Sequence, residues 1–385
     1  MNKQDLYDYI DTQQESIYEL WKNLVSIESQ SQNVDGVNQM ASHLDTYCSA
    51  LGLNTRKYIF EHAGASLVAF TRKTEKESVA LMAHMDTVHP AGAFGTELFR
   101  EDGTYVYGPG VYDCKGGIVI ALLVMRTLVH AGYDKRQLKL ILSGDEEVAH
   151  SLSGGKAIEV YTQEVKDCAA AFNCESAPLN GDVVTQRKGG TVVKITVKGV
   201  AAHAGAAPEK GASAIREAAD KILAIEALTD FTGTTFNCGK ISGGTGSNVI
   251  ADYCEFVVGI RFKNNADCQK AIKQLEEICA VKKDERTTTI MEPQSTFMAM
   301  EKTPGTDALF ATYADACTEL GIDRPNALYA GGCSDAAYVA MEGVPVLCGV
   351  GVRGSDNHSP KERALKSSIC EQAKKLVTAI VNLDE

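Results

Sequence analysis

Short apolar runs alternate with longer helical patterns over two stretches of the chain, Val79–Glu175 and Thr306–Leu383. The run S-V-A-L-M-A-H at 78–84 is typical of a strand buried on both faces, and 116–130 has the length and repeat of a helix. Further strands are predicted at 138–144, 168–175 and 344–351, and further helices at 306–320 and 367–383. This alternation indicates βαβ units, so we expect an α/β domain with a mixed, mostly parallel sheet and helices on both of its faces.

The segment 188–296 has a different pattern. Apolar and polar residues alternate at 191–200 and 253–262, as in an antiparallel sheet with one exposed face. Helical patterns at 212–227 and 265–280 accompany these strands. We therefore predict an inserted α+β domain of four strands and two helices at 188–296, which interrupts a discontinuous domain made of 1–187 and 297–385.

Composition narrows the class of protein. A length of 385 residues suggests two or three domains, and 44% hydrophobic with 23% charged residues is typical of a globular protein. The net charge of −12, with no basic run, argues against binding to nucleic acid or to an anionic membrane. No apolar stretch reaches the roughly 18 to 20 residues of a membrane helix, and the N-terminus lacks the pattern of a secretory signal. We expect a cytoplasmic protein that is not in a membrane.

The first candidate functional residues lie at the end of the first predicted buried strand. His84 and Asp86 stand two residues apart, so strand alternation directs both side chains to the same face. Asp113 lies in the Gly/Pro-rich loop that precedes the helix at 116–130. Taken singly, His84 is equally explained as the polar end of a strand, and Asp113 as a helix cap.

Further acids and a histidine follow other predicted strands. Glu146 and Glu147 come directly after 138–144, Glu175 ends 168–175, and His358 comes after 344–351. A solvated turn would explain the acid pair alone. The carboxyl ends of parallel strands share one edge of a sheet, however, so all these side chains are expected to converge there. Carboxylates with imidazoles suit zinc or a similar divalent ion, and the number of acids suggests two ions bridged by one carboxylate.

The motifs that contain these residues resemble those of the co-catalytic dizinc metallopeptidase family. Members of that family include glutamate carboxypeptidase, aminoacylase, acetylornithine deacetylase, succinyl-diaminopimelate desuccinylase and tripeptidase. The resemblance covers nearly the whole chain and is closest to glutamate carboxypeptidase. The motifs are H-M-D-T-V (84–88), G-P-G-V-Y-D-C-K-G-G (108–117), D-E-E (145–147), C-E-S (174–176), A-H-A-G (202–205), G-G-C-S-D-A-A-Y (331–338) and N-H-S (357–359).

The resemblance implies two Zn2+ ions, for which Co2+ or Mn2+ are possible substitutes. It assigns His84 and Glu175 to one ion. It assigns Glu147 and His358 to the other ion, with Asp113 as the bridge between the two.

The resemblance also implies a catalytic mechanism. A hydroxide bridging the metals would attack the scissile carbonyl, with Glu146 as general base. Asp86 would orient the imidazole of His84, and His203 would stabilise the oxyanion. The insert would be a ferredoxin-like lid and dimerisation domain, through which a homodimer forms and His203 can reach the partner's site.

The same resemblance implies substrate contacts. Arg261 would bind a substrate carboxylate and Asn248 would also contact substrate. Gly331, Gly332 and Ser334 would form a loop that approaches the substrate.

Two positions depart from the family pattern, and neither is a predicted ligand. Many members have aspartate where this chain has Cys114, and proline where it has Ala251. In relatives the peptide bond after the bridging aspartate is cis, which predicts a cis Asp113–Cys114 bond here.

The predicted activity is release of a C-terminal amino acid from a small peptide or an N-acyl amino acid with a free carboxylate. A deacylase of the acetylornithine deacetylase or aminoacylase type is the main alternative, since only the pocket would differ. A two-metal phosphoesterase would need cationic groups beside the metals. A scaffold that has lost catalysis would be free to lose the base, whereas this chain retains Glu146.

Overall fold

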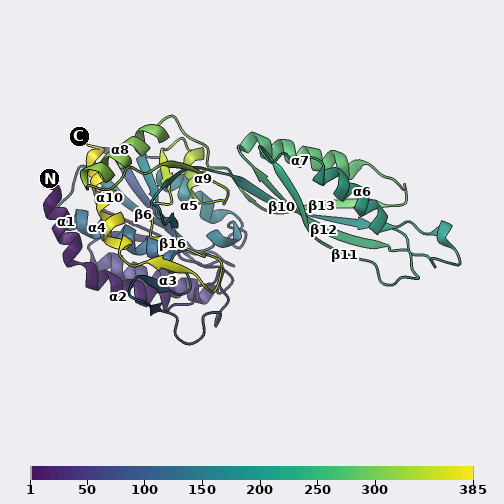
Figure 1. The fold of residues 1–385 in the computed structure, drawn as a ribbon, viewed down its shortest axis with the longest axis horizontal. Helices are drawn as coiled ribbons and strands as arrows, with labels where there is room; N and C mark the ends of the chain where they lie inside the picture. Colours follow the sequence, from purple (N-terminus) through teal and green to yellow (C-terminus); the bar gives the residue numbers. More distant parts are fainter. Residues whose placement is uncertain (1, 385) are drawn as a thin grey trace. The chain divides into compact units, whose positions relative to one another are not determined.

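The computed structural model describes residues 2–384, which divide into two compact units (Figure 1). The second unit comprises Arg187–Met300 together with Gly331–Cys333. The first unit comprises the described residues up to Gln186, then Glu301–Ala330, then those from Ser334 onwards. The insert predicted at 188–296 lies inside the second unit.

A mixed sheet forms the centre of the first unit. Strands β6, β3, β7 and β15 are mutually parallel, with antiparallel neighbours on either side, as the sequence predicted. The order is β1 (Asn54–Tyr58), β2 (Ser66–Phe70), β6 (Arg136–Ser143), β3 (Lys76–His84), β7 (Cys168–Asn173), β15 (Val346–Cys348), β9 (Val183–Arg187) and β14 (Ala327–Ala330).

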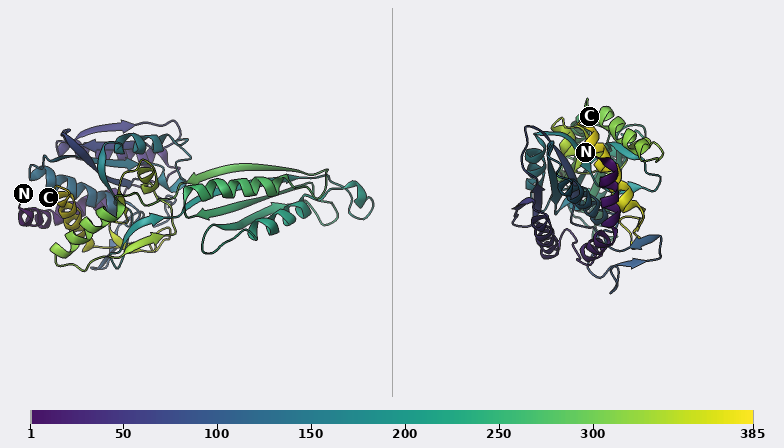
Figure 2. Two further views of the ribbon diagram at one scale, coloured as in Figure 1. Left: turned by 90° about the horizontal axis from the view of Figure 1, so that it is seen from above. Right: turned by 90° about the vertical axis from the view of Figure 1, so that its left-hand side faces the viewer.

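Helices cover both faces of this sheet (Figure 2). Val79 and Leu81 of β3 share a core cluster with α4, while Ala80 and Met82, which point to the opposite face, are also fully buried. The helices of this unit are α1 (Lys3–Thr12), α2 (Gln14–Val25), α3 (Val34–Ala50), α4 (Lys115–His130), α5 (Lys156–Val165), α8 (Thr306–Glu319), α9 (Ala336–Met341) and α10 (Ser368–Asn382).

A further sheet of short strands was not predicted. Its order is β4 (Arg100–Glu101), β5 (Tyr105–Tyr107), β17 (Arg363–Leu365), β16 (Arg353–Ser355) and β8 (Ala177–Pro178). The strand expected at 344–351 is limited to β15, and β16 follows it. His358 therefore lies in the loop that joins β16 to β17.

The carboxyl ends of the parallel strands are aligned. His84 at the end of β3 pairs with Ser143 at the end of β6, and Asn173 at the end of β7 pairs with both Met82 and Cys348. This register sets the turns that follow these strands along one edge, where polar side chains can meet.

Glycine permits α4 to approach this edge closely. A Cβ added at Gly117, in the first turn of α4, would lie 1.8 Å from the Cys174 carbonyl oxygen. Any side chain here would push the start of α4 away from the residues that follow β7.

The second unit is an antiparallel sheet with two helices on one face (Figure 1). Alternate residues of β12 are buried under the helices, while Arg261 and its same-face neighbours point to the open face. The strand order is β11 (Thr235–Gly243), β12 (Tyr253–Phe262), β10 (Gly189–Lys198) and β13 (Thr288–Phe297), and the helices are α6 (Ala214–Glu226) and α7 (Asn265–Ala280).

Among residues 2–384, no helix has both the length and the apolar character needed to cross a bilayer.

Candidate metal centre

The five predicted metal ligands meet at the carboxyl edge of the central sheet. His84 ends β3 and Asp113 precedes α4. Glu147 lies in the 3-10 turn Glu146–Val148 after β6, Glu175 follows β7, and His358 lies between β16 and β17.

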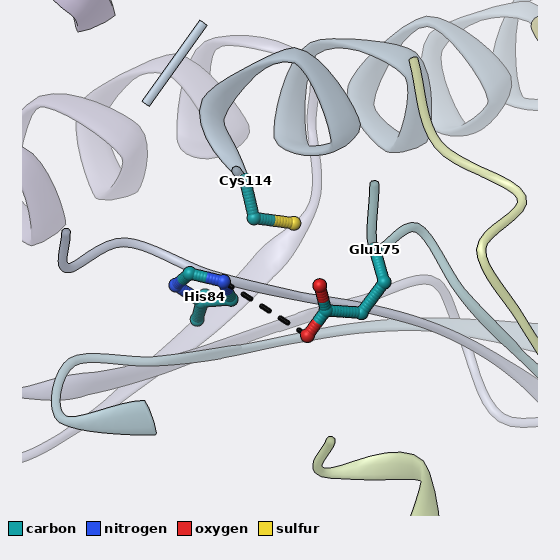
Figure 3. Close-up of side chains that lie close together, drawn as sticks. All are labelled: His84, Cys114 and Glu175. Carbon is teal, nitrogen blue, oxygen red and sulfur yellow. Dashed lines mark ion pairs between the residues drawn. The ribbon is translucent and has the colours of Figure 1, made fainter. Parts of the chain in front are cut away.

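His84, Asp113 and Glu175 form one half of the cluster. His84 Nε2 lies 3.1 Å from Asp113 Oδ1 and 3.9 Å from Glu175 Oε1. The three residues are at most 7% exposed. Figure 3 shows the Glu175 carboxylate turned toward the His84 ring. The donor atoms of His84, Asp113 and Glu147 lie within 4.8 Å of one another, close enough to hold a cation, and so do those of His84, Cys114 and Glu175.

His358, Glu147 and the other oxygen of Asp113 form the second half. His358 Nε2 lies 3.1 Å from Glu147 Oε2 and 3.4 Å from Asp113 Oδ2. Asn357 Nδ2 also donates to Asp113 Oδ2, at 2.8 Å. The two oxygens of Asp113 therefore face two different sets of nitrogen and oxygen donors.

Asp86 holds both His84 and the acidic turn. The Nδ1 atom of His84 donates to the Asp86 carbonyl oxygen at 3.0 Å and lies 3.4 Å from Asp86 Oδ1, which directs Nε2 toward the cluster. The Asp86 carboxylate accepts from the backbone N–H groups of Glu146 and Glu147, both at 3.1 Å, and from Ser31 Oγ at 2.7 Å. Asp86 is fully buried, and these contacts satisfy its charge.

The acid pair lies in a tight turn after β6. Glu146 and Glu147 begin a 3-10 turn, in which successive side chains are separated by about 120° around the axis. The two carboxylates can therefore point in different directions, and that of Glu147 contacts His358.

Several ionisable side chains lie close together in this cluster, and their pKa values are shifted from the ordinary ones. Burial, with a further contribution from Asp113, raises the pKa of Glu147 to about 7. Hydrogen bonds to Asp113 and Glu147 raise the pKa of His358 to about 10. Burial would raise the pKa of Asp113, but bonds from the two histidines hold it well below its ordinary value.

The residues present fit a pair of divalent ions. Glu147 Oε1 is buried without a hydrogen-bond partner among the described residues, although its own Oε2 contacts His358. An unpaired carboxylate oxygen is costly unless a cation receives it. Imidazole nitrogens with carboxylate oxygens match the donors that zinc and similar ions take in proteins, and metal binding would displace protons from the imidazoles.

The thiol of Cys114 also lies beside His84 and Glu175 (Figure 3). Its Sγ donates to the Cys174 carbonyl oxygen at 3.2 Å, and burial raises its pKa well above the ordinary value. Cys114 therefore lies at the border of the cluster, within 4.8 Å of the donor atoms of His84 and Glu175. The Asp113–Cys114 peptide bond is cis, as the resemblance implied.

Ser334 lies in the first unit and is fully buried. Its Oγ lies 2.8 Å from Asn173 Nδ2, from which it accepts a hydrogen bond, and 3.4 Å from Glu175 Oε1. Ser334 therefore contacts the predicted ligand Glu175. Contact between Ser334 and a substrate stays a prediction.

The other predicted substrate residues lie in the second unit, with Gly331 and Gly332 in the loop beside Cys333. Arg261 Nη1 contacts Cys333 Sγ at 3.2 Å, so Arg261 adjoins this loop. His203 and Asn248 come together at another place in the unit, where His203 pairs with Val249.

Sequence reasoning gave His150 no role, yet it occupies a buried cluster beside the acidic turn. Its Nδ1 lies 2.9 Å from Asp145 Oδ1 and its Nε2 lies 2.5 Å from Asp335 Oδ1. Carboxylates only accept hydrogen bonds, so both ring nitrogens carry protons and the ring is charged. Asp145 and Asp335 belong to the D-E-E and G-G-C-S-D motifs, which was the one signal in the sequence for this link.

The charge on His150 predicts how stability depends on pH. Burial would lower its pKa, but Asp335 and Asp145 raise it from 6.5 to about 10. Its contribution to stability is complete below pH 6.5 and is lost as pH rises through about 10. The free energy of unfolding of the metal-free protein should therefore fall over this range, and His150 alone should contribute at most about 1.4 kcal/mol for each pH unit.

Urea unfolding at pH 7, 8 and 9 measures this slope. The double variant His150→Gln/Asp335→Asn removes the imidazole together with one acid, so the slope should become smaller by up to about 1.4 kcal/mol for each pH unit, while the part due to His358, whose pKa is also raised to about 10, should remain. Equal slopes in the two proteins would contradict the assignment of this charge.

Comparison with known proteins places the chain among metallopeptidases and deacylases. Residues 185–287 match the peptidase dimerisation domain, and residues 66–222 match peptidase family M28. Carboxypeptidase G2 from Pseudomonas sp. (strain RS-16) is 29% identical over 366 residues, covering 92% of this chain and 86% of that protein. Acetylornithine deacetylase from Myxococcus xanthus is 32% identical over 203 residues, covering 48% of this chain and 49% of that protein.

A solved structure shares the fold. Aminopeptidase PepT from Bacillus cereus superposes with a TM-score of 0.80 at 22% identity, over 97% of this chain and 99% of that one. The resemblance predicted from the motifs is confirmed, and with it the expected class of amide hydrolase. The chain is related to the metallopeptidases and amidohydrolases that include carboxypeptidase G2 and acetylornithine deacetylase, and it contains a peptidase dimerisation domain.

Proposed function

We propose that this protein is a two-metal amide hydrolase that releases the C-terminal amino acid from a small peptide or an N-acyl amino acid. The observation that carries the proposal is the position of Asp113, whose Oδ1 faces His84 and whose Oδ2 faces His358. A carboxylate shared in this way is suited to bridge two ions. The 29% identity to carboxypeptidase G2 over most of both chains supports the hypothesis that the substrate is a peptide.

His84 and Glu175 would hold one Zn2+ ion, and Glu147 and His358 the other, with Asp113 between them. Two divalent charges would offset the four acids Asp113, Glu146, Glu147 and Glu175. When bound, such ions polarise an amide carbonyl and make an attacking water molecule more acidic. Co2+ or Mn2+ are possible substitutes, since both accept imidazole and carboxylate donors.

Glu146 would be the general base. It is 7% exposed, and its backbone N–H is fixed by Asp86, which also fixes the neighbouring ligand Glu147. Burial, with repulsion from Glu175 and Asp335, raises its pKa well above the ordinary value despite the opposing effect of His84. A more basic carboxylate takes a proton from water more readily. The same carboxyl group would then deliver that proton to the leaving amine nitrogen.

His203 would donate a hydrogen bond to the carbonyl oxygen as it gains negative charge. Its Nδ1 accepts from the backbone N–H groups of Gly205 and Ala206, both at 3.1 Å. In a neutral imidazole the proton is then on Nε2, which makes that atom a donor. His203 is exposed, so Nε2 is accessible to a substrate.

Arg261 would bind the substrate carboxylate, but it lies far from His203 within the second unit. Arg261 pairs with Thr235, whereas Cys254, seven residues earlier in β12, pairs with Gly243 next to the segment that contacts His203. Roughly 23 Å of strand separates these positions. One dipeptide is too short to touch both, which supports a homodimer in which each subunit supplies His203 to its partner's site.

Three further residues would contact the substrate. Asn248, next to His203, would contact substrate, and Gly331 and Gly332 would approach it through their backbone. The cytoplasmic location expected from the sequence also stays a prediction.

A substrate panel tests the class of reaction. Dipeptides and N-acyl amino acids with a free carboxylate should be hydrolysed in the presence of Zn2+ or Co2+. Blocking the terminal carboxylate as an amide should lower kcat/KM by about 10- to 100-fold, because the charged hydrogen bonds to Arg261 are lost. Activity on acetylornithine alone would instead identify a deacylase.

Glu146→Gln tests the base. The amide cannot accept the proton, so kcat should fall by at least about 100-fold. Metal content, measured by mass spectrometry of the purified protein, should remain at two ions per chain. Retained turnover would contradict the role of Glu146, and loss of metal would mean that Glu146 is a ligand.

Mixing two inactive variants tests the exchange of His203. His203→Ala chains keep Glu146, and Glu146→Gln chains keep His203, so a mixed dimer would have one complete site. After unfolding and refolding an equal mixture, activity should recover to about one quarter of the wild-type value, since half of the dimers are mixed and each has one working site. No recovery, with mixed dimers present by native mass spectrometry, would show that His203 acts within its own subunit.

A further inference from the structure

Glu362 is a buried acid that the proposed mechanism does not use. It is fully buried, and its carboxylate accepts hydrogen bonds from backbone N–H groups of a single loop. Oε1 accepts from Tyr112 and from Asp113, both at 2.9 Å, and Oε2 accepts from Gly110 at 3.3 Å. The backbone of the predicted bridging residue is thus bound directly to this carboxylate.

The same carboxylate binds a histidine from another segment. His89 Nε2 lies 2.6 Å from Glu362 Oε2, and the His89 ring packs edge-on against Phe94 with 4.9 Å between ring centroids. His89 is 7% exposed, so the pair is shielded from water. A buried carboxylate is costly unless it is fully hydrogen-bonded, and these four bonds meet that need.

The segments joined at Glu362 are those that carry predicted metal ligands. His89 follows His84 by five residues, the loop contributes Asp113, and Glu362 follows His358 by four residues. Glu362 therefore ties together three ligands that are separated by up to 274 positions in the chain.

The loop has little room to relax by itself. Gly110 has a φ of +77°, and a Cβ there would lie 2.8 Å from Thr87 Cγ2. On the other side, Asn357 holds Asp113 Oδ2. With the backbone fixed by Glu362 and one oxygen fixed by Asn357, the carboxylate of Asp113 is held so that its two oxygens face different histidines.

We infer that Glu362, together with His89, is a positioning residue of the metal centre, which sets the orientation of Asp113 between the two ion sites. This inference rests on the proposed function, since it assumes that ions bind at Asp113. Outer hydrogen bonds of this kind commonly change metal affinity by about 10- to 100-fold when they are removed.

Glu362→Gln is the direct test. The amide keeps one acceptor oxygen, but its NH2 group replaces an acceptor that faces the Gly110 N–H group and His89. The dissociation constant for Zn2+, measured by competition with a chromophoric chelator, should rise by about 10- to 100-fold for at least one of the two ions. The rise in Tm that Zn2+ gives to the metal-free protein should shrink accordingly.

Glu217→Gln is a matched control. Glu217 is 2% exposed, accepts from the Lys283 backbone N–H at 3.0 Å and pairs with Lys221 at 2.9 Å, but it belongs to the second unit. Its substitution should lower the Tm of the metal-free protein while both Zn2+ dissociation constants and the Zn2+-induced rise in Tm stay at wild-type values.

His89→Phe is a milder second variant in case Glu362→Gln does not fold. It removes one of the four bonds to Glu362 and retains a ring against Phe94, so Zn2+ affinity should change in the same direction by a smaller factor. Wild-type Zn2+ affinity in every folded variant would overturn the inference. Failure of the wild-type protein itself to bind two ions would overturn the proposed function instead.

Discussion

The burial of several acids at one edge of a single sheet is the constraint on which the rest of the first unit depends. Asp86, Asp113, Glu146 and Glu175 are at most 7% exposed, and buried carboxylates are stable only with partners. The aligned ends of β3, β6 and β7 bring Asp86, Glu146 and Glu175, which follow these strands, to the same edge. The surrounding turns are therefore arranged to supply hydrogen bonds, protonated imidazoles or, in the proposed state, metal ions.

The acidic residues in and around the cluster fall into two groups according to the hydrogen-bond partners of their carboxylates. The carboxylates of Asp86 and Glu362 each accept from at least two backbone N–H groups, and so they hold loops in place. By contrast, Glu147 Oε1 is buried without a hydrogen-bond partner among the described residues, and Asp113 is shared between two histidines. The first group builds the frame by hydrogen bonding alone. The second group would receive the cations of the proposed function, because Glu147 Oε1 has no other partner among the described residues and Asp113 lies between two histidines.

The kind of contact also decides which parts of the structure could be predicted from the sequence. Strand patterns predicted the central sheet, and the ends of those strands identified His84 and Glu175 as neighbours, because parallel strands share an edge. The links from Glu362 to Asp113 and from Asp335 to His150 could not be predicted, since they span 249 and 185 positions and depend on short turns. The sheet of two- and three-residue strands around His358 was missed for the same reason, because such strands are too short to show a periodic pattern.

The second unit poses a different problem, because its candidate residues are widely spaced. Arg261 and the pair His203 and Asn248 lie near opposite ends of β12, whereas a residue in an extended peptide spans only about 3.3–3.6 Å. A rigid sheet cannot bring the two ends to one small substrate. A two-fold dimer solves this without bending the sheet, because each copy can give one end to its own site and the other end to its partner's. If Arg261 and His203 both contact substrate as proposed, the match to a peptidase dimerisation domain concerns catalysis as well as assembly, since a single chain would then lack one of these two contacts.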